Sequence, residues 1–430
     1  MAEFVLEAPP GKSLERREWE DLLRRFVDSL RPAPSRVLLV PPDGTRRHSG
    51  AGTLTNVLYH LLARRSRVQV LPATGTHRPM DPGELRAMFG DIPLEAFLEH
   101  HWRRDTVPIG TIPGEVTARV SCGAVSEEIV VAVNRLLPEG GFDLILSIGQ
   151  VLPHEVVGMA NYTKNIVVGL GGEDIINKSH YISAVYGIER TLGRDRTPVR
   201  ELYDYAETRF LDGLAIRYLL TVNHTLVDPA TGTSPLAGLY IGRDRKLFEQ
   251  AVALSRSVNI TRLVEPISTF VVYLDEKEFR STWLGCKAIY RTRLAVADGG
   301  HVVMIAPGLE RLGEDPLFDR IIRKYGYVGT ERITRLVETR EDLRRNLAVA
   351  AHLIHGSTEG RFHVTVATDT VDRRVIQSVG FGHMSLEEAR QRYRYQERTP
   401  GRHTASDGSP FYYIANPAAG LWAAAGRLDD

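Results

Sequence analysis

Short apolar runs alternate with segments of helical periodicity along most of the chain. The apolar runs predict strands at 37–40, 68–71, 144–147, 270–274, 302–305 and 362–366. The segments between them predict helices, among them 53–63, 126–136, 243–255 and 340–355. Because strands that alternate with helices are typical of βαβ units, the pattern predicts an α/β fold with mostly parallel sheets.

A domain boundary is expected between Val264 and Ser268. The Glu265-Pro266 pair ends any preceding helix, and the strong predicted strand at 270–274 follows directly. With 430 residues the chain is long enough for two or three domains of about 150 residues each. We therefore expect a first α/β domain over 1–265 and a second one after it.

The composition narrows the function classes. Lys and Arg total 54 against 53 Asp and Glu, and this balance gives no indication of nucleic-acid or anionic-membrane binding. The chain has two cysteines, Cys122 and Cys286, so a disulfide scaffold, a Cys-rich zinc site and a chain-supplied iron–sulfur cluster are excluded. No secretion signal or membrane-length apolar run is visible, which makes the cytoplasm the expected location.

Chemistry-bearing residues follow the first two predicted strands, where ligands of open α/β sheets bind. In residues 43–46, Asp-Gly-Thr-Arg, Arg46 offers a planar fork for a carboxylate or phosphate, or else is a solvated loop residue. In residues 73–80, His77 could transfer a proton or bind a ligand, or else be a core histidine.

The segment after the third predicted strand carries His154, Lys164 and His180 in a His-x9-Lys-x15-His arrangement. This is not a local metal motif, because two histidine ligands on one helix would be four residues apart. Glycines at 169–172 lack the full spacing of a dinucleotide-binding loop, so a phosphate-binding turn and a plain loop both stay open.

Trp283 and Lys287 follow the predicted strand at 270–274. Their spacing of four would put them on one face of a helix. There Lys287 could bind an anion, and Trp283 could form one wall of the binding pocket. A core tryptophan beside a lysine that reaches out to solvent is the alternative.

Together these segments resemble the lactate racemase family, the nickel-pincer-nucleotide-dependent 2-hydroxyacid racemases and epimerases. Residues 43–46 resemble the family's Asp-x-Thr-Arg loop, and residues 73–79 resemble its Ala-Thr-Gly-x-His-Arg-Pro segment. The His-x9-Lys-x15-His spacing is also the family's, and Lys287 resembles a family lysine that helps to hold substrate. The resemblance runs in order from Val37 to the end of the chain.

The resemblance implies a cofactor and a role for each residue. The cofactor would be a nickel pincer nucleotide, the pyridinium-3-thioamide-5-thiocarboxylic acid mononucleotide, attached covalently to Lys164. His180 would ligate its nickel, His77 and His154 would be the two catalytic acid/bases, and Arg46 would bind the substrate carboxylate. Two acid/bases suit inversion of a hydroxylated carbon, because each enantiomer needs a base for its hydroxyl proton.

The resemblance also implies an architecture and partners. We expect two α/β domains with a ligand cleft between them. The first, 1–265, would carry the cofactor and the acid/base residues, the second would span 266–400, and residues 401–430 would return to the first. Cofactor-maturation proteins and a small 2-hydroxy acid are the expected partners, no nucleic acid or membrane is, and homo-oligomerisation is left open.

The chain departs from the lactate-specific members of the family at two places. Asn161-Tyr162-Thr163 precedes Lys164 in place of a Ser-Gly-Gly-Arg run, and Trp283 stands where those members have tyrosine. These changes predict polar groups and an added wall in the substrate pocket. We therefore expect a larger, more hydroxylated substrate, an aldonic acid such as gluconate or mannonate epimerised at C2.

Several alternatives stay open. The substrate could be lactate or another short 2-hydroxy acid. A metal-dependent hydrolase or lyase could use His77, His154 and His180 as direct ligands. A sugar-acid-binding protein would also have two α/β lobes, and a nicotinamide dehydrogenase is weakened by the missing fingerprint after the first predicted strand.

Overall fold

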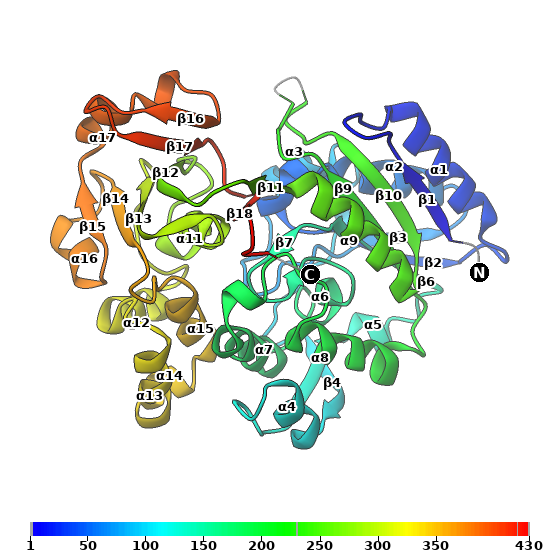
Figure 1. Ribbon diagram of the computed structural model, residues 1–430. Coiled ribbons are helices and arrows are strands. Elements are labelled where there is room, and N and C mark those ends of the chain that lie inside the picture. The colour runs from blue at the N-terminus through cyan, green and yellow to red at the C-terminus, as the bar shows by residue number, and fades with distance from the viewer. Residues whose placement is uncertain (1–2, 229–230, 419, 429–430) are drawn as a thin grey trace. The chain divides into compact units, whose positions relative to one another are not determined.

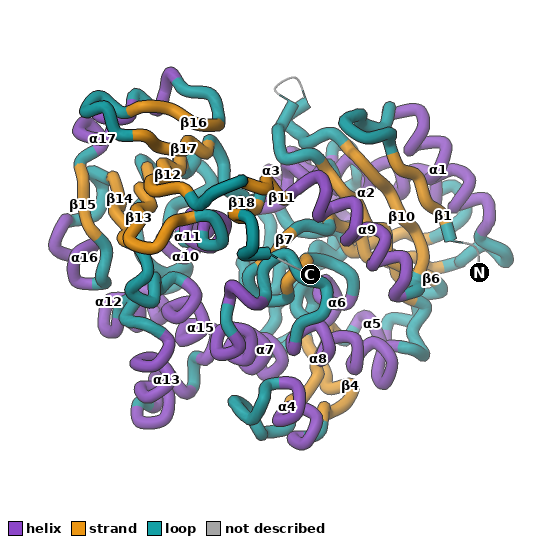
Figure 2. Tube along the Cα trace, in the orientation of Figure 1, coloured by secondary structure: helices purple, strands orange, loops and turns teal. Residues whose placement is uncertain are grey.

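The computed structural model describes residues 3–228, 231–418 and 420–428 and divides the chain into two compact units (Figure 1). The first unit consists of residues 1–179 and 194–259, and the second of residues 180–193 and 260–430. Helix α7 (Glu173–Tyr186) contains the first crossing from one unit to the next. Each unit is α/β, as the sequence predicted (Figure 2).

The first unit is built on a six-stranded sheet. Its strands are, in spatial order, β1 (Phe4–Glu7), β10 (Leu236–Gly242), β9 (Ile216–Asn223), β6 (Leu144–Gln150), β2 (Arg36–Val40) and β3 (Arg67–Val70). From β9 to β3 neighbouring strands are parallel, while β1 and β10 pair antiparallel at the other edge. Its helices, besides the start of α7, are α1 (Arg16–Ser29), α2 (Ala51–Leu62), α3 (Pro82–Phe89), α4 (Gly114–Val120), α5 (Leu136–Glu139), α6 (Thr163–Val167), α8 (Pro198–Ala206) and α9 (Arg245–Asn259).

Helices cover both faces of this sheet. Leu39 of β2 and Ile148 of β6 belong to the core cluster that α1 and α2 close on one face. On the other face α9 packs so tightly that a Cβ at Gly238 would meet the Leu254 side chain at 2.5 Å. Because both faces are buried, the central strands form continuous apolar runs in the sequence instead of alternating ones.

The predicted helix at 126–136 is wrong. Residues Ile129–Asn134 form strand β5, which pairs antiparallel with β4 (Thr106–Ile112). Ile129, Val131 and Val133 are buried and the residues between them are half-buried, which is the two-residue period of a strand. The β-branched residues of this run therefore outweighed its weak helical periodicity.

The second unit has a six-stranded sheet of its own. Its strands are, in spatial order, β15 (Gly382–Met384), β14 (His363–Ala367), β13 (Val296–Ile305), β12 (Ile267–Tyr273), β17 (Pro410–Ile414) and β16 (Gly401–Thr404). All neighbours are parallel except β16 and β17. Its other elements are β11 (Ile260–Leu263), β18 (Leu421–Ala424), α10 (Thr282–Gly285), α11 (Lys287–Thr292), α12 (Pro316–Tyr325), α13 (Thr330–Thr339), α14 (Glu341–Arg344), α15 (Leu347–His355), α16 (Arg373–Ser378) and α17 (Leu386–Tyr393).

The last segment of the chain lies in the second unit, which differs from the expected return of 401–430 to the first domain. Strand β17 extends the second sheet by pairing with β12, and β18 pairs with β11. The unit boundary at 259–260 falls a few residues before the predicted one. The predicted helix at 340–355 is present as two pieces, α14 and α15, with a break at Arg345–Asn346.

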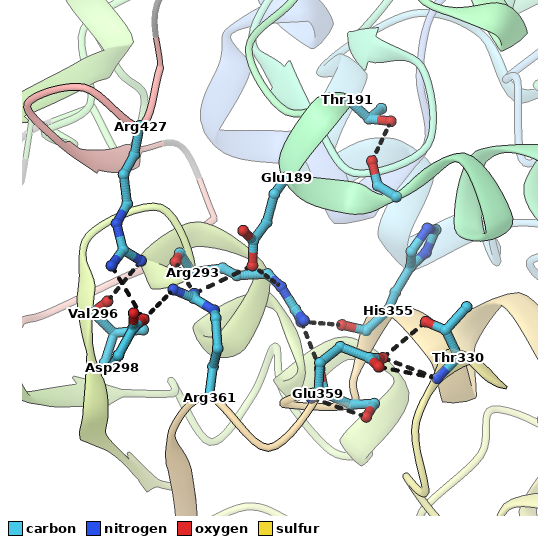
Figure 3. Close-up of polar contacts among 12 residues, drawn as sticks. Glu189, Thr191, Arg293, Val296, Asp298, Thr330, His355, Glu359, Arg361 and Arg427 are labelled. Atoms are coloured by element: carbon cyan, nitrogen blue, oxygen red, sulfur yellow. Dashed lines mark hydrogen bonds and ion pairs between the residues drawn. The ribbon is translucent and has the colours of Figure 1, made fainter. Parts of the chain in front are cut away.

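Segment 180–193 is held in the second unit by ion pairs at Glu189 (Figure 3). The carboxylate of Glu189 accepts from Nε of Arg293 at 2.9 Å and lies 3.2 Å from Nη2 of Arg361. Arg361 also pairs with Asp298 at 2.9 Å, and Asp298 pairs with Arg427 at 3.1 Å.

No helix in the described part of the chain is long and apolar enough to cross a membrane.

Candidate functional site

The order in which the chain adds strands to the first sheet reverses at β2. From β2 it adds β3 on one side, and β6 then pairs with the other side of β2. In such a sheet the crevice beyond the carboxyl ends of these strands is where ligands bind. The segments that follow β2, β3 and β6 carry Arg46, His77 and His154 respectively, so sequence and topology select the same edge.

His77 is held by Asp43. Its Nδ1 lies 2.6 Å from Oδ2 of Asp43, and the other carboxylate oxygen accepts from the N–H and hydroxyl of Thr45 at 3.1 and 2.6 Å. Burial opposes ionisation of Asp43, but the hydrogen bond and charge of His77 outweigh it, so the pKa of this carboxyl is lowered. Because the carboxylate accepts from Nδ1, Nε2 of the neutral imidazole is left as a proton acceptor.

His154 is held in the opposite sense. It is buried in the short hairpin of β7 (Pro153–His154) and β8 (Gly158–Met159). The N–H of Val156 donates to its Nδ1 at 3.0 Å, so the neutral imidazole carries its proton on Nε2. One imidazole of the pair thus presents a bare Nε2, and the other presents an Nε2–H that can donate a hydrogen bond.

Arg46 presents an unpaired donor. It lies half-buried in the 3-10 turn Gly44–Ser49, which its backbone N–H closes by donating to the carbonyl of Asp43 at 3.0 Å. Its Nη1 is buried, and no residue in the described ranges accepts a hydrogen bond from it. Since an unsatisfied buried donor costs about 1–3 kcal/mol, this guanidinium is suited to an anionic oxygen from a ligand.

Lys164 is half-buried in the first turn of α6. Its pKa is lowered to about 8, first by desolvation and then by the positive charge of Arg46, while Glu155 and Asp43 act in the opposite direction. A lysine with this pKa presents a substantial fraction of neutral amine near neutral pH, and the neutral amine is the nucleophilic form.

Two amide side chains in the same part of the unit have unmatched polar atoms. Gln150, at the end of β6, has no partner among the described residues for either amide atom, and Asn161 has none for its Nδ2. A Cβ at Gly149 would meet that Nδ2 at 2.8 Å, so Asn161 lies directly against β6. Unmatched donors together with the Lys164 amine fit a polar, covalently attached group such as the nucleotide cofactor that the sequence implies.

Tyr162 and Thr163 do not line a pocket, contrary to expectation. The Tyr162 ring stacks on Phe248 with centroids 5.2 Å apart, and its hydroxyl donates to the carbonyl of Arg243 at 3.0 Å. The Thr163 hydroxyl accepts from Arg200 at 2.9 Å. Both side chains are buried and satisfied inside the first unit, which leaves Asn161 as the polar group available before Lys164.

Trp283 and Lys287 lie in the second unit, on two short helices, α10 and α11, that meet at Cys286 instead of forming one helix. Trp283 stacks on His352 with ring centroids 4.3 Å apart. Lys287 is buried, with Nζ 3.9 Å from a carboxylate oxygen of Glu278. Their contributions to substrate binding stay predictions.

His180 lies half-buried on α7, in the part of this helix that belongs to the second unit. Its role as nickel ligand stays a prediction. Within the described ranges no group of three or more His, Cys, Asp or Glu side chains could hold a metal ion by itself.

The sequence alone did not identify three of these features. It did not link Asp43 to His77, whose Nδ1 lies against the Asp43 carboxylate. The two residues follow adjacent parallel strands, and this was the signal that could have paired them. Gln150 was detectable only as a polar residue that ends a buried strand, and nothing in the sequence singled out Arg200.

Comparison with known sequences finds similarity to lactate racemases. Residues 23–191 match a family model described as the lactate racemase N-terminal domain. A lactate racemase of Thermoanaerobacterium thermosaccharolyticum is 24% identical over 253 residues, which are 55% of this chain and 55% of that protein. The chain thus spans about half the length of this curated relative.

Two solved structures have the same fold. A protein of Thermotoga maritima superposes with a TM-score of 0.84 at 24% identity, covering 97% of this chain and 100% of the other. The lactate racemase apoprotein of Thermoanaerobacterium thermosaccharolyticum superposes with a TM-score of 0.67 at 17% identity, covering 94% and 92%. At these identities the superpositions establish the fold alone.

Proposed function

From the match of residues 23–191 to the lactate racemase N-terminal domain we propose that the chain is a racemase or epimerase that inverts C2 of a 2-hydroxy acid. The observation that carries the proposal is the pair of histidines in the first unit. Asp43 holds Nδ1 of His77, whereas the N–H of Val156 holds Nδ1 of His154. The two neutral imidazoles therefore present different groups at Nε2, a proton acceptor on His77 and a hydrogen-bond donor on His154.

Arg46 would bind the substrate carboxylate. Its buried Nη1 has no partner among the described residues, so a carboxylate oxygen gains a charge-assisted hydrogen bond there. A fixed carboxylate lets the hydrogen and hydroxyl at C2 exchange positions while the rest of the substrate stays in place. Lys287 and Trp283 would add binding contacts.

His77 and His154 would exchange the hydroxyl proton of the substrate. For one enantiomer the bare Nε2 of His77 would accept this proton. For the mirror-image substrate His154 would be the base, which requires its other tautomer, with a bare Nε2 and with Nδ1 no longer accepting from the Val156 N–H. A positioned acid or base contributes about 10²–10⁴-fold in rate, and imidazole exchanges protons readily near neutral pH. Asp43 would keep the His77 imidazole oriented and stabilise its charged form.

Lys164 would hold the nickel pincer nucleotide through a covalent bond, and His180 would be the protein ligand of its nickel. When bound, the cofactor supplies acceptance and return of the hydride at C2. The lowered pKa of Lys164 supports its role as the attachment residue, because attachment requires the neutral amine. The unmatched amide atoms of Gln150 and Asn161 would bind polar parts of the cofactor or substrate.

An aldonic acid such as gluconate or mannonate is the proposed substrate, with lactate or another short 2-hydroxy acid as the second candidate. The test is an assay of holoenzyme, made together with cofactor-maturation proteins, on aldonates and short 2-hydroxy acids in D₂O. We expect C2 inversion of an aldonate with the original hydrogen retained at C2, because hydride transfer does not exchange it with solvent. Activity confined to lactate would exclude the aldonate, and deuterium at C2 would exclude hydride transfer.

A further inference from the structure

The backbone directly before Lys164 adopts an unusual conformation. Asn161 and Tyr162 have positive φ angles of 71° and 58°, and neither is glycine. The Tyr162 ψ of −133° places this residue in a region that side-chain-bearing residues rarely occupy. Such a conformation persists only where the surrounding structure holds it in place.

Arg200 of α8 is the residue that contacts this turn from inside the unit. It is 1% exposed, and its Nη2 donates to the carbonyls of Met159 at 2.6 Å and Asn161 at 3.2 Å. Its Nη1 donates to the hydroxyl of Thr163 at 2.9 Å. The guanidinium also lies over the Phe248 ring, 4.6 Å from its centroid.

We propose that Arg200 is a positioning residue that fixes the turn before Lys164 and the hairpin of His154 in one arrangement. The link to His154 runs through Met159, whose carbonyl Arg200 binds and which pairs with Pro153 in the hairpin. Arg200 therefore acts on both segments without reaching the substrate. The inference rests on the proposed function for the roles of Lys164 and His154, whereas the role of Arg200 follows from the contacts above.

Asp204 and Asp195 favour the charged form of Arg200, while its buried Nε has no acceptor among the described residues. The Thr163 hydroxyl, which accepts from Arg200, lies 3.5 Å from Oδ1 of Asp204. Arg245 pairs with Asp204 at 3.0 Å and with Asp195 at 2.7 Å. A planar guanidinium can serve two carbonyls and a hydroxyl at fixed angles, whereas the single ammonium of a lysine cannot.

The charge of Arg200 also reaches Lys164. Arg46 and Arg200 lower the pKa of this lysine beyond the effect of desolvation, while Glu155 and Asp43 raise it. Removing the Arg200 charge should therefore raise the pKa of the Lys164 amine. Because Arg200→Lys keeps this charge, the pH profile of Lys164 measures the effect of the charge, and amide exchange of the turn measures the effect of the backbone contacts.

The experiment is competitive acetylation of the cofactor-free full chain with acetic anhydride across pH 6–11, with the Lys164 peptide quantified by mass spectrometry. Wild type should show a midpoint near pH 8. In Arg200→Met we expect a midpoint about 0.5 pH unit higher, which slows labelling at pH 7.5 about 3-fold. Arg243→Met is the matched control, because Arg243 also clamps backbone carbonyls of the first unit, those of Leu211, Asp212 and Leu214.

Arg200→Lys keeps the positive charge but loses the planar guanidinium that binds the turn. This variant also provides a test if Arg200→Met does not fold. Amide hydrogen exchange of the 158–165 peptide should rise about 10-fold in this variant and stay at the wild-type rate in Arg243→Met. Unchanged exchange in Arg200→Lys, or an equal rise in the control, would overturn the proposal. So would a wild-type acetylation midpoint in a folded Arg200→Met. Neither readout needs cofactor or turnover, so this proposal and the proposed function can fail independently.

Discussion

Two arginines, one in each unit, show how a site for ligand differs from a structural contact. In the second unit Arg293 donates through Nε to Glu189 and through Nη1 to the carbonyls of His355 and Ser357, at 2.9, 3.2 and 2.6 Å (Figure 3). In the first unit Arg46 keeps its Nη1 buried without an acceptor in the described part of the chain. Both arginines have a buried Nη1, but only that of Arg293 donates to acceptors within the fold.

The difference indicates where function lies. A buried donor that forms its bonds within the fold contributes stability, whereas a buried donor left unmatched costs stability and gains it back when a ligand arrives. Gln150 and Asn161 share this property with Arg46 in the first unit. Substitutions should therefore affect activity around Arg46 and stability around Arg293.

The largest effect is expected for Lys164→Arg. Arginine keeps a positive charge but cannot supply a neutral amine, so covalent attachment should be lost and turnover should fall at least ~10³-fold. Turnover of variant made with the maturation proteins measures this loss. Lys178→Arg, in the Lys178–Asp174 ion pair at 2.9 Å, is the matched control and should keep wild-type turnover.

Asp43→Asn should lower turnover about 10²–10⁴-fold, because an amide no longer fixes the proton on Nδ1 of His77. Rates in both directions of inversion, measured by circular dichroism of the substrate, check the prediction. The ratio kcat/KM should fall by the same factor in both directions, because the variant cannot change the equilibrium constant of the inversion. Equal rates to wild type would show that Asp43 does not orient this imidazole.

Arg46→Met should lower kcat/KM about 10²-fold, mainly through a higher KM, because the substrate loses its carboxylate partner. Unfolding in urea should show no loss of stability, since the wild-type Nη1 has no acceptor among the described residues. A KM equal to that of wild type would remove Arg46 from the substrate site.

Arg293→Met should give the reverse result. Removing this buried guanidinium takes one donor from Glu189 and one from each of two backbone carbonyls, and we expect the free energy of unfolding to fall by about 2–4 kcal/mol. Urea denaturation measures it, with KM of the folded enzyme as the control. A large change in KM without loss of stability would contradict the comparison.

The smallest effect concerns acid stability. The pKa of Asp43 in the folded chain is below its ordinary value of 3.8, so its ionisation stabilises the fold above that value. This contribution is lost as the pH falls through the lowered folded pKa. The free energy of unfolding, measured by urea denaturation between pH 6 and 3, should therefore fall more steeply for wild type than for Asp43→Asn. Parallel curves would show that Asp43 is not stabilised as the carboxylate.

The central strands, and the chemistry-bearing loops that follow them, could be predicted from the sequence. Buried parallel strands appear as continuous apolar runs, and ligands bind in the loops at their carboxyl ends. Strand β5 was missed because its β-branched run also fits a helical period. The placement of β17 beside β12 was missed because pairing between strands far apart in the chain leaves no local trace.

The candidate residues Arg46, His77, His154 and Lys164 could be identified from spacing, but their physical state could not. Which nitrogen of His77 is held depends on Asp43, and the pKa of Lys164 depends on burial and on Arg46. Both follow from distances between segments. The expectation for Tyr162 and Thr163 failed for the same reason, since their orientation is set by contacts with α8 and α9.

The most direct test of the central claim is the intact mass and nickel content of the full chain made together with cofactor-maturation proteins, followed by peptide mapping. We expect an added mass of the size of the pincer nucleotide on the Lys164 peptide, with nickel bound in proportion to it. A bare-sequence mass in a preparation that inverts C2 of a 2-hydroxy acid would contradict it.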